Sequence, residues 1–229
     1  MKTLFVIGAA MFLMLGAMAC SGNGEANEAK GKIDTQTEVT ADENAVAKAP
    51  DPADQRSPIR NEANQIVTIE TDFGKMVLEL YHDVAPAHAD SFAARTTDGF
   101  YNGLTFHRIV DGFMIQGGDP QGTGMGNAGY YLPAEFSNVK HVDGTLSMAR
   151  SQDPNSASCQ FFICLGPTPF LDGKYTVFGQ LLKGYDVLHA IGKVETVAPP
   201  HNPREKSKPV TDVKMRKLYL SDAEGNPLE

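Results

Sequence analysis

Hydrophobic and polar residues alternate in short runs from residue 65 onward, and this period of two is typical of β-strands with one face in a core. The clearest runs are residues 65–71, QIVTIET, and 76–81, MVLELY, and the turn-forming residues 72–75 between them predict a hairpin. Further strands are expected at Thr105–Ile109, Phe113–Gly117, Thr145–Ala149, Gln160–Cys164, Thr176–Leu181 and Val210–Leu220.

Two stretches have the character of helices. Pro86 suits the first turn of a helix that runs to about Thr97, with Gly99 as its stop, and a shorter helix is expected at Tyr185–Ile191. Many short strands with only two helices predict a mainly β fold, either a barrel or a sandwich. These elements are expected to form one domain over residues 66–221, followed by a C-terminal tail at 222–229.

The first 65 residues follow a different pattern. Lys2, an apolar run at 4–15 and small residues up to Ala19 have the layout of a signal peptide over residues 1–19, and the run is shorter than the about 20 residues of a spanning helix. Residues 17–20, AMAC, resemble a bacterial lipobox, which predicts a lipid on Cys20, although Ala17 stands where leucine is preferred. An ordinary signal peptide cut nearby is the alternative, and it would leave Cys20 without a role.

Residues 20–65 are expected to be a disordered linker that carries this lipid. Between 21 and 65 the sequence has no aromatic residue and few large aliphatic ones, so it cannot bury enough apolar surface to offset its chain entropy. Ser21 after the cysteine resembles an outer-membrane sorting signal. We therefore expect a protein of the cell envelope that is lipid-anchored through Cys20, in the outer membrane facing the periplasm if the cell is Gram-negative.

Charge and cysteine content exclude several classes of partner. The net charge of −8 offers no basic footprint for nucleic acid. If their strand is extended, Cys159 and Cys164 lie about 16 Å apart on opposite faces, so they are expected to be two buried free thiols rather than a disulfide. The histidines show no ligand spacing, and we expect no metal and no cofactor. A monomer is the default expectation.

Three segments carry the chemistry of the chain: residues 106–119, FHRIVDGFMIQGGD, then 160–166, QFFICLG, and 170–175, FLDGKY. In this order they resemble the cyclophilin family of peptidyl-prolyl cis-trans isomerases, over about residues 66–221. The resemblance implies a closed eight-stranded antiparallel β-barrel capped by two α-helices. It also implies catalysis of rotation about X–Pro bonds in proline-containing polypeptides, here to assist the folding of exported proteins.

Rotation about an X–Pro bond makes and breaks no covalent bond, so the site needs an apolar pocket and a well-placed donor rather than a nucleophile or a metal. Arg108 is the candidate donor to the imide nitrogen, and Gln116 is placed to bind the substrate carbonyl or the backbone beside it. The candidate pocket walls are Phe113, Met114, Phe162 and Leu171. Period-two alternation puts Met114 and Gln116 on one face of a strand, and Phe113 does not follow that alternation.

The resemblance assigns catalytic roles to Arg108 and Gln116. It assigns substrate binding to His107, Phe113, Met114, Gly122, Thr123, Ala149, Arg150, Gln160, Phe162, Phe170, Leu171 and Tyr175. Three of these depart from the best-known eukaryotic pattern, in which tryptophan stands at the position of Phe170, histidine at that of Tyr175 and asparagine at that of Arg150. Phe170 lacks the indole N–H, so weak inhibition by cyclosporin is expected.

Other interpretations were weighed. Residues 124–129, GMGNAG, match a dinucleotide fingerprint in letters, but no helix follows and no βαβ unit surrounds them. His107 could suggest a general base, although a structural or substrate-positioning role is favoured. Residues 193–209 are expected to be a solvated connection. A module that holds proline segments without turnover, and a holdase chaperone, remain alternatives to an isomerase.

Overall fold

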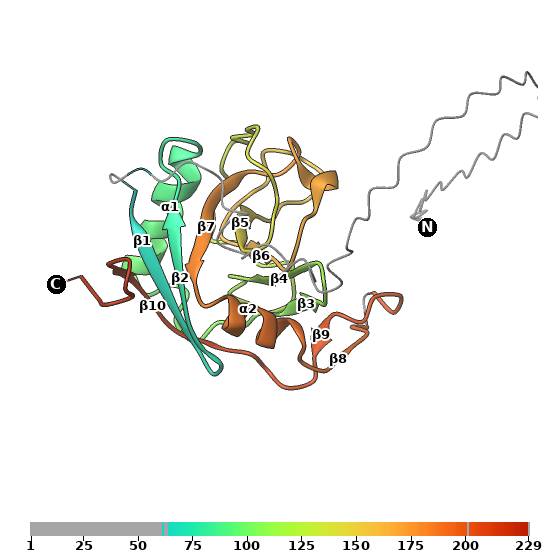
Figure 1. Cartoon of the computed structure of the whole chain (residues 1–229). Helices are drawn as coiled ribbons and strands as arrows, with labels where there is room; N and C mark the ends of the chain where they lie inside the picture. The colour runs from blue at the N-terminus through green and yellow to red at the C-terminus, as the bar shows by residue number, and fades with distance from the viewer. Residues whose placement is uncertain (1–60, 62–63, 201, 229) are drawn as a thin grey trace, which may run out of the picture. The chain divides into compact units, whose positions relative to one another are not determined.

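One eight-stranded antiparallel sheet dominates the computed structural model, which describes residues 61, 64–200 and 202–228. The strands are β1 (Ile66–Thr71), β2 (Gly74–Leu80), β3 (Arg108–Val110), β4 (Met114–Gly117), β5 (Thr145–Met148), β6 (Phe161–Cys164), β7 (Val177–Lys183) and β10 (Met215–Ser221). Their spatial order is β10-β1-β2-β7-β5-β6-β4-β3, and the sheet curls round a buried interior (Figure 1). The expected signal peptide, Cys20 and nearly all of the expected linker lie outside the described residues.

The expected closed barrel is not confirmed, because the ladder leaves β10 and β3 as the two edges of the sheet. The chain just before each of these strands comes together instead: Phe106 N donates to Val213 O at 2.9 Å and Met215 N to Leu104 O at 2.8 Å. The outer edge of β3 is occupied by another segment, since Ile109 N donates to Ser207 O at 2.7 Å. The result is a curled sheet whose edge strands are not paired with each other.

Both predicted helices are confirmed, as α1 (Pro86–Thr97) and α2 (Tyr185–Gly192). Helix α1 packs on β10 and β7, and α2 packs on β2, β3 and β4. The first turn of α1 has no side-chain cap of its own. Glu135 replaces it, because its two carboxylate oxygens accept the N–H groups of Ala87 and His88, each at 3.1 Å.

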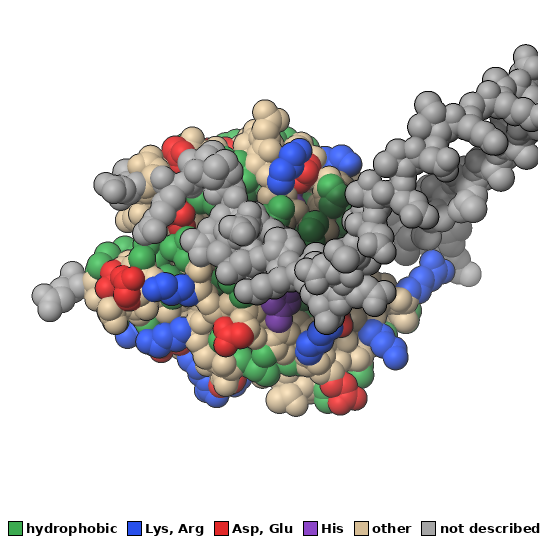
Figure 2. Space-filling view, viewed as in Figure 1, with side chains coloured by type: hydrophobic (Ala, Val, Ile, Leu, Met, Phe, Trp, Pro, Cys, Tyr) green, Lys and Arg blue, Asp and Glu red, His purple; other side chains and the backbone are tan. Residues whose placement is uncertain are grey.

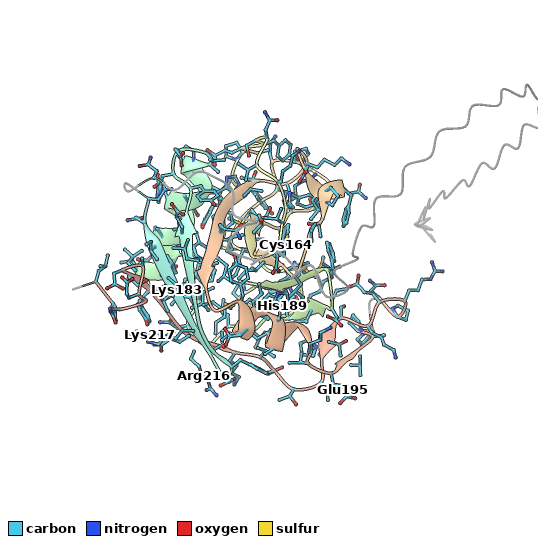
Figure 3. All side chains as sticks on the ribbon, viewed as in Figure 1. Cys164, Lys183, His189, Glu195, Arg216 and Lys217 are labelled. Atoms are coloured by element: carbon cyan, nitrogen blue, oxygen red, sulfur yellow. The ribbon has the colours of Figure 1, made fainter. Side chains whose placement is uncertain are left out.

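An aromatic group fills the interior under α1. The ring of Phe92 lies 5.0 Å from that of Tyr101, 5.1 Å from that of Phe161 and 5.4 Å from that of Phe178. All four side chains are almost completely buried. Cys159 and Cys164 are also buried and neither forms a disulfide, as predicted. Figure 3 shows Cys164 inside the fold, and burial raises the pKa of its thiol to about 12, so it is held as an unreactive thiol.

Several boundaries differ from the sequence prediction. The last strand begins at Met215 rather than Val210, because Val210 N donates to Glu195 O at 2.9 Å and so belongs to a separate loop. That loop, predicted as a solvated connection, contains the two-stranded ladder β8 (Thr196–Val197) with β9 (Lys208–Pro209). The 3-10 turn η2 (Pro169–Leu171) was not predicted.

The two ends of the described domain are tied to it. Asn61 N and Asn64 Nδ2 donate to Glu79 Oε1 at 3.3 and 3.0 Å, although both residues fall in the expected linker. In the expected tail, Leu228 N donates to Leu220 O at 3.0 Å, so this segment folds back on β10. Among the described residues no helix is long and apolar enough to cross a membrane.

Candidate active site

Strands β3, β4 and β6 place the candidate residues side by side. Arg108 on β3 is paired with Gln116 on β4, and Gln116 is paired with Phe162 on β6. Met114, two residues earlier on β4, shares the face of Gln116. The strand begins at Met114, so Phe113 lies in the turn that precedes it, which explains why Phe113 does not follow the alternation.

A second apolar cluster lies on this face, separate from the main core. Met114, Phe162, Cys164 and Leu171 form it, and partly buried neighbours pack against them, among them Phe113, Ala149 and Tyr175. The cluster borders a cavity of about 150 Å³, here called the central cavity. Its lining consists only of predicted site residues: Arg108, Phe113, Met114, Gln116, Ala149, Arg150, Phe162, Leu171 and Tyr175.

Two further cavities adjoin the central one. The first, of about 340 Å³, shares Gln116, Ala149 and Arg150 with it and reaches Gln160; we call it the Gln160 cavity. The second, of about 230 Å³, shares Arg108 with it and contains His107, Gly122, Thr123 and Glu205; we call it the Glu205 cavity. The three hollows therefore follow one another along the same face, with Arg108 and Gln116 at the junctions.

Arg108 is held from two directions. Its Nε and Nη2 donate to the two carboxylate oxygens of Glu205, each at 2.8 Å, and its Nη1 donates to Gln116 Oε1 at 3.3 Å. The same Nη1 lies 3.6 Å from Met114 Sδ, a weak acceptor, and the guanidinium carbon lies 5.7 Å from the centre of the Phe113 ring. Because sulfur is a weak acceptor, the N–H directed at Met114 is the one that can most easily hydrogen-bond a substrate atom instead.

Glu205 was missed by the sequence analysis. It lies 97 residues from Arg108 in a loop whose other features are prolines and lysines, and no spacing rule connects the two positions. Its contact with the Arg108 guanidinium holds the pKa of the carboxyl below its usual 4.5.

A directed series of amide hydrogen bonds supports Gln116 on its other side. Gln116 Nε2 donates to Gln160 Oε1 at 3.0 Å, and Gln160 Nε2 donates to the carbonyl oxygens of Gly124 and Gly126 at 3.1 and 2.8 Å. Carbonyl oxygens only accept, so they fix which end of each amide is nitrogen. That orientation places Gln116 Oε1 toward Arg108.

The other predicted residues lie round the rim. The Phe170 ring is 60% exposed and packs on Phe113 with centres 5.6 Å apart. Tyr175 meets Phe162 edge-on at 5.9 Å, and the Arg150 guanidinium lies 4.5 Å from the centre of the Tyr175 ring. Arg150 also donates to Lys174 O from Nε and Nη2, so its side chain is fixed rather than free to move.

His107 faces the Glu205 cavity, and neither of its ring nitrogens has a hydrogen-bond partner among the described residues. Burial lowers its pKa below 6.5, so the ring is neutral near pH 7. No nucleophile is paired with it in the described part of the chain. The geometry thus offers no partner for a general base, and the structural or substrate-positioning role stays a prediction.

Two supports behind the site were not predicted. The Asp119 carboxylate accepts the N–H groups of Gln121 and Thr123 at 2.8 and 2.9 Å, which fixes the loop that carries Gly122 and Thr123. His141 stacks on Phe162 with ring centres 6.1 Å apart, while its Nδ1 lies 3.1 Å from Asp172 Oδ1. The Asp119 hydrogen bonds are local, within one loop, whereas the His141 contacts join residues of different segments.

Charges of both signs are mixed on the described surface. On the face shown in Figure 2, acidic and basic side chains are interspersed over the coloured residues, without a continuous basic patch. The described residues also contain no group of three or more side chains placed to hold a metal ion.

An apolar pocket, a cation at its edge and an amide beside that cation define a site suited to prolyl isomerisation, and comparison with known proteins identifies the class. Residues 66–220 match the model of the cyclophilin type peptidyl-prolyl cis-trans isomerase/CLD family. The match covers most of the chain, so the chain belongs to this family, and it is a peptidyl-prolyl cis-trans isomerase.

Individual relatives come from distant organisms. Peptidyl-prolyl cis-trans isomerase-like 1 of Mus musculus is 43% identical over 161 residues, which cover 68% of this chain and 92% of the relative. A peptidyl-prolyl cis-trans isomerase of Synechococcus elongatus is 48% identical over 112 residues, covering 49% of this chain and 77% of the relative. A crystal structure of a Cryptosporidium parvum cyclophilin matches with a TM-score of 0.64 and 31% identity, covering 69% of this chain and 98% of that one.

Proposed function

We propose that the isomerase acts through Arg108 at the central cavity, and that it serves the folding of exported proteins at the cell envelope. The observation that carries the first part is the position of Arg108 Nη1. It lies at the edge of an apolar cavity, beside Met114 and Phe113, with a hydrogen directed only at a thioether sulfur. A proline ring in this cavity would bring its imide nitrogen to that hydrogen.

Magnitudes show why the pocket and the cation must act together. The rotation barrier is about 18–20 kcal/mol, and a million-fold acceleration requires lowering it by about 8 kcal/mol. A single charged hydrogen bond contributes about 1.5–3 kcal/mol in ordinary settings. The apolar walls provide the rest, since they remove water from the carbonyl, weaken amide resonance and strengthen the field of the guanidinium.

Gln116 would orient the substrate. One hydrogen of its Nε2 is used by Gln160, and the second remains to donate to a substrate carbonyl. Proline-containing polypeptides are the substrate class. The structure of the Cryptosporidium relative determined in the presence of the dipeptide Ala-Pro supports this class for a protein 32% identical to this chain. The acting form is a monomer in this proposal, since one chain carries the whole site.

The test of the mechanism is Arg108→Ala in the full chain, assayed by cis-to-trans exchange of an Ala-Pro peptide. Activity is expected to fall by at least about a hundredfold, because the donor to the imide nitrogen is lost. Arg216→Ala is the matched control, because Arg216 is an exposed arginine paired with Asp72 and lines none of the three cavities. Circular dichroism checks that both variants fold. Turnover like that of the wild type in Arg108→Ala would refute the mechanism.

The envelope part of the proposal is supported by the apolar run at 4–15 and the small residues before Cys20. It is tested in cells by labelling with a radioactive fatty acid and by membrane fractionation. The wild type is expected to take up the label and to sediment with membranes, and Cys20→Ala is expected to lose both. Equal labelling of the two proteins, or none of the wild type, would contradict a lipid on Cys20.

A further inference from the structure

The loop 193–209 places a carboxylate against the arginine of the site. Glu205 binds the Nε–Nη2 edge of the Arg108 guanidinium with two hydrogen bonds of 2.8 Å. Bidentate pairs of this kind fix the plane of the guanidinium as well as its position. Both side chains are about one-third exposed, so the pair lies at the surface of the groove rather than in the core.

The backbone that follows Glu205 is fixed to β3. Ser207, which is buried, accepts the N–H of Ile109 on β3 at 2.7 Å, and its own N–H donates to Val197 O at 3.1 Å. The Ser207 side chain also hydrogen-bonds Glu205 and helps to lower the pKa of its carboxyl. The carboxylate is therefore held charged, two residues from a backbone anchor on β3.

Glu205 and the substrate pocket lie on different sides of Arg108. Glu205 lines the Glu205 cavity and is absent from the lining of the central cavity. Its hydrogen bonds use the Nε and Nη2 donors, which leaves Nη1 directed at Gln116 and Met114. A carboxylate that blocked the site would instead have to lie among the apolar walls.

We propose that Glu205 is a positioning residue for the isomerisation, which holds the guanidinium of Arg108 from the side opposite the substrate so that Nη1 points into the central cavity. The inference rests on the proposed role of Arg108. Without Glu205 the long arginine side chain would sample other rotamers, and a displacement of the donor by about 1 Å is enough to cost much of the rate.

The experiment is a double-mutant cycle in the full chain: wild type, Glu205→Gln, Arg108→Ala and the double variant. Glu205→Gln is expected to lower kcat about tenfold with little change in KM, because binding of the proline ring by the apolar walls is unaffected. Glu205→Asp, which keeps the charge, is expected to recover part of the loss. In the Arg108→Ala background, Glu205→Gln is expected to change nothing further.

Glu195→Gln is the matched control, because it removes the same charge from an exposed residue of the same loop, at the outer edge seen in Figure 3. A second measurement does not depend on activity. The hydrogen on Arg108 Nε is expected to exchange with solvent slowly in the wild type and in Glu195→Gln, and at least about tenfold faster in Glu205→Gln, by NMR.

Three results would overturn the proposal: unchanged kcat in Glu205→Gln, a raised kcat, which would make Glu205 an inhibitory contact, or a further loss in the Arg108→Ala background. Failure of the proposed mechanism is distinguished from these, since it appears as full activity in Arg108→Ala alone. The exchange rate at Nε would then still report whether Glu205 holds the arginine.

Discussion

At the scale of single residues, Phe170 bears on how tightly the site binds cyclosporin. Its ring packs on Phe113 at the rim of the central cavity and is 60% exposed. The position is the one where tryptophan is common in the cyclophilins that bind cyclosporin. Phenylalanine supplies apolar area but no N–H donor, so one hydrogen bond to that ligand is lost while the pocket itself is intact.

We expect Phe170→Trp to tighten inhibition by cyclosporin about tenfold, the value of one added hydrogen bond, and to leave isomerase activity nearly unchanged. The exposed rim has room for the larger ring. Inhibition constants measured with an Ala-Pro peptide check this, with Phe170→Leu as a control that changes the apolar area without adding a donor. Nanomolar inhibition of the wild-type chain by cyclosporin would contradict this, because it would show that tight binding does not need the indole N–H.

Site residues that belong to a recognisable local motif could be predicted. Residues that reach the site from a separate segment of the chain could not. The walls and the cation come from three segments with recognisable order, and the structure brings nine predicted residues to one cavity. Asp119 acts locally, on the N–H groups of its own loop, and was overlooked, whereas Glu205 and His141 act through contacts between separate segments. Neither of the two segments has a sequence pattern that indicates such a contact, so it is recognised only in the folded structure.

At the scale of elements, local signals located the elements better than their ends. Pro86 and Gly99 gave α1 nearly residue by residue, because these residues impose backbone geometry directly, and α2 extends only one residue beyond its prediction, to Gly192. Strand ends depend on which neighbour supplies the next hydrogen bond. Val210 has the apolar character of a strand residue, but its N–H is used by Glu195 O, so the last strand starts later.

The same dependence explains why the sequence prediction of a closed barrel is not confirmed. Closure needs β3 and β10 to pair, and the edge of β3 is instead used by Ser207. The segment that occupies this edge is the one that carries Glu205. One loop therefore leaves the sheet open at β3 and places a carboxylate on Arg108, which joins a feature of the fold to a feature of the site.

At the scale of the whole molecule, three histidines connect stability with pH: His88 and His141, which are buried, and His107, which is partly buried. His88 is fully buried, and its Nδ1 lies 2.6 Å from Glu135 Oε2, while its Nε2 has no partner among the described residues. His107 lies between Asp119, which favours its charged form, and Arg108, which opposes it. Asp172 likewise favours the charged form of His141. Burial outweighs the carboxylate in all three cases and lowers the three pKa values below 6.5.

A lowered histidine pKa means that the unfolded chain binds protons more readily than the folded one. Stability is therefore full above the unfolded value of 6.5 and decreases as the pH falls below it, by up to about 1.4 kcal/mol per pH unit for each histidine. Carboxyls with lowered pKa values, such as those of Asp119 and Glu205, act in a separate window, because their loss begins only below about pH 4.5.

We predict that the free energy of unfolding, measured by urea titration, is constant between pH 8 and 7 and falls between pH 6.5 and 5. Glu135→Gln should steepen the fall, because it removes the carboxylate that favours protonated His88, whereas Glu224→Gln, at an exposed carboxylate paired with Lys183 rather than with a histidine, should leave the slope unchanged. A free energy that stays level down to pH 5 in the wild type would mean that the protein accepts the three imidazolium charges at these sites, and the inferred cost of burying them would be wrong.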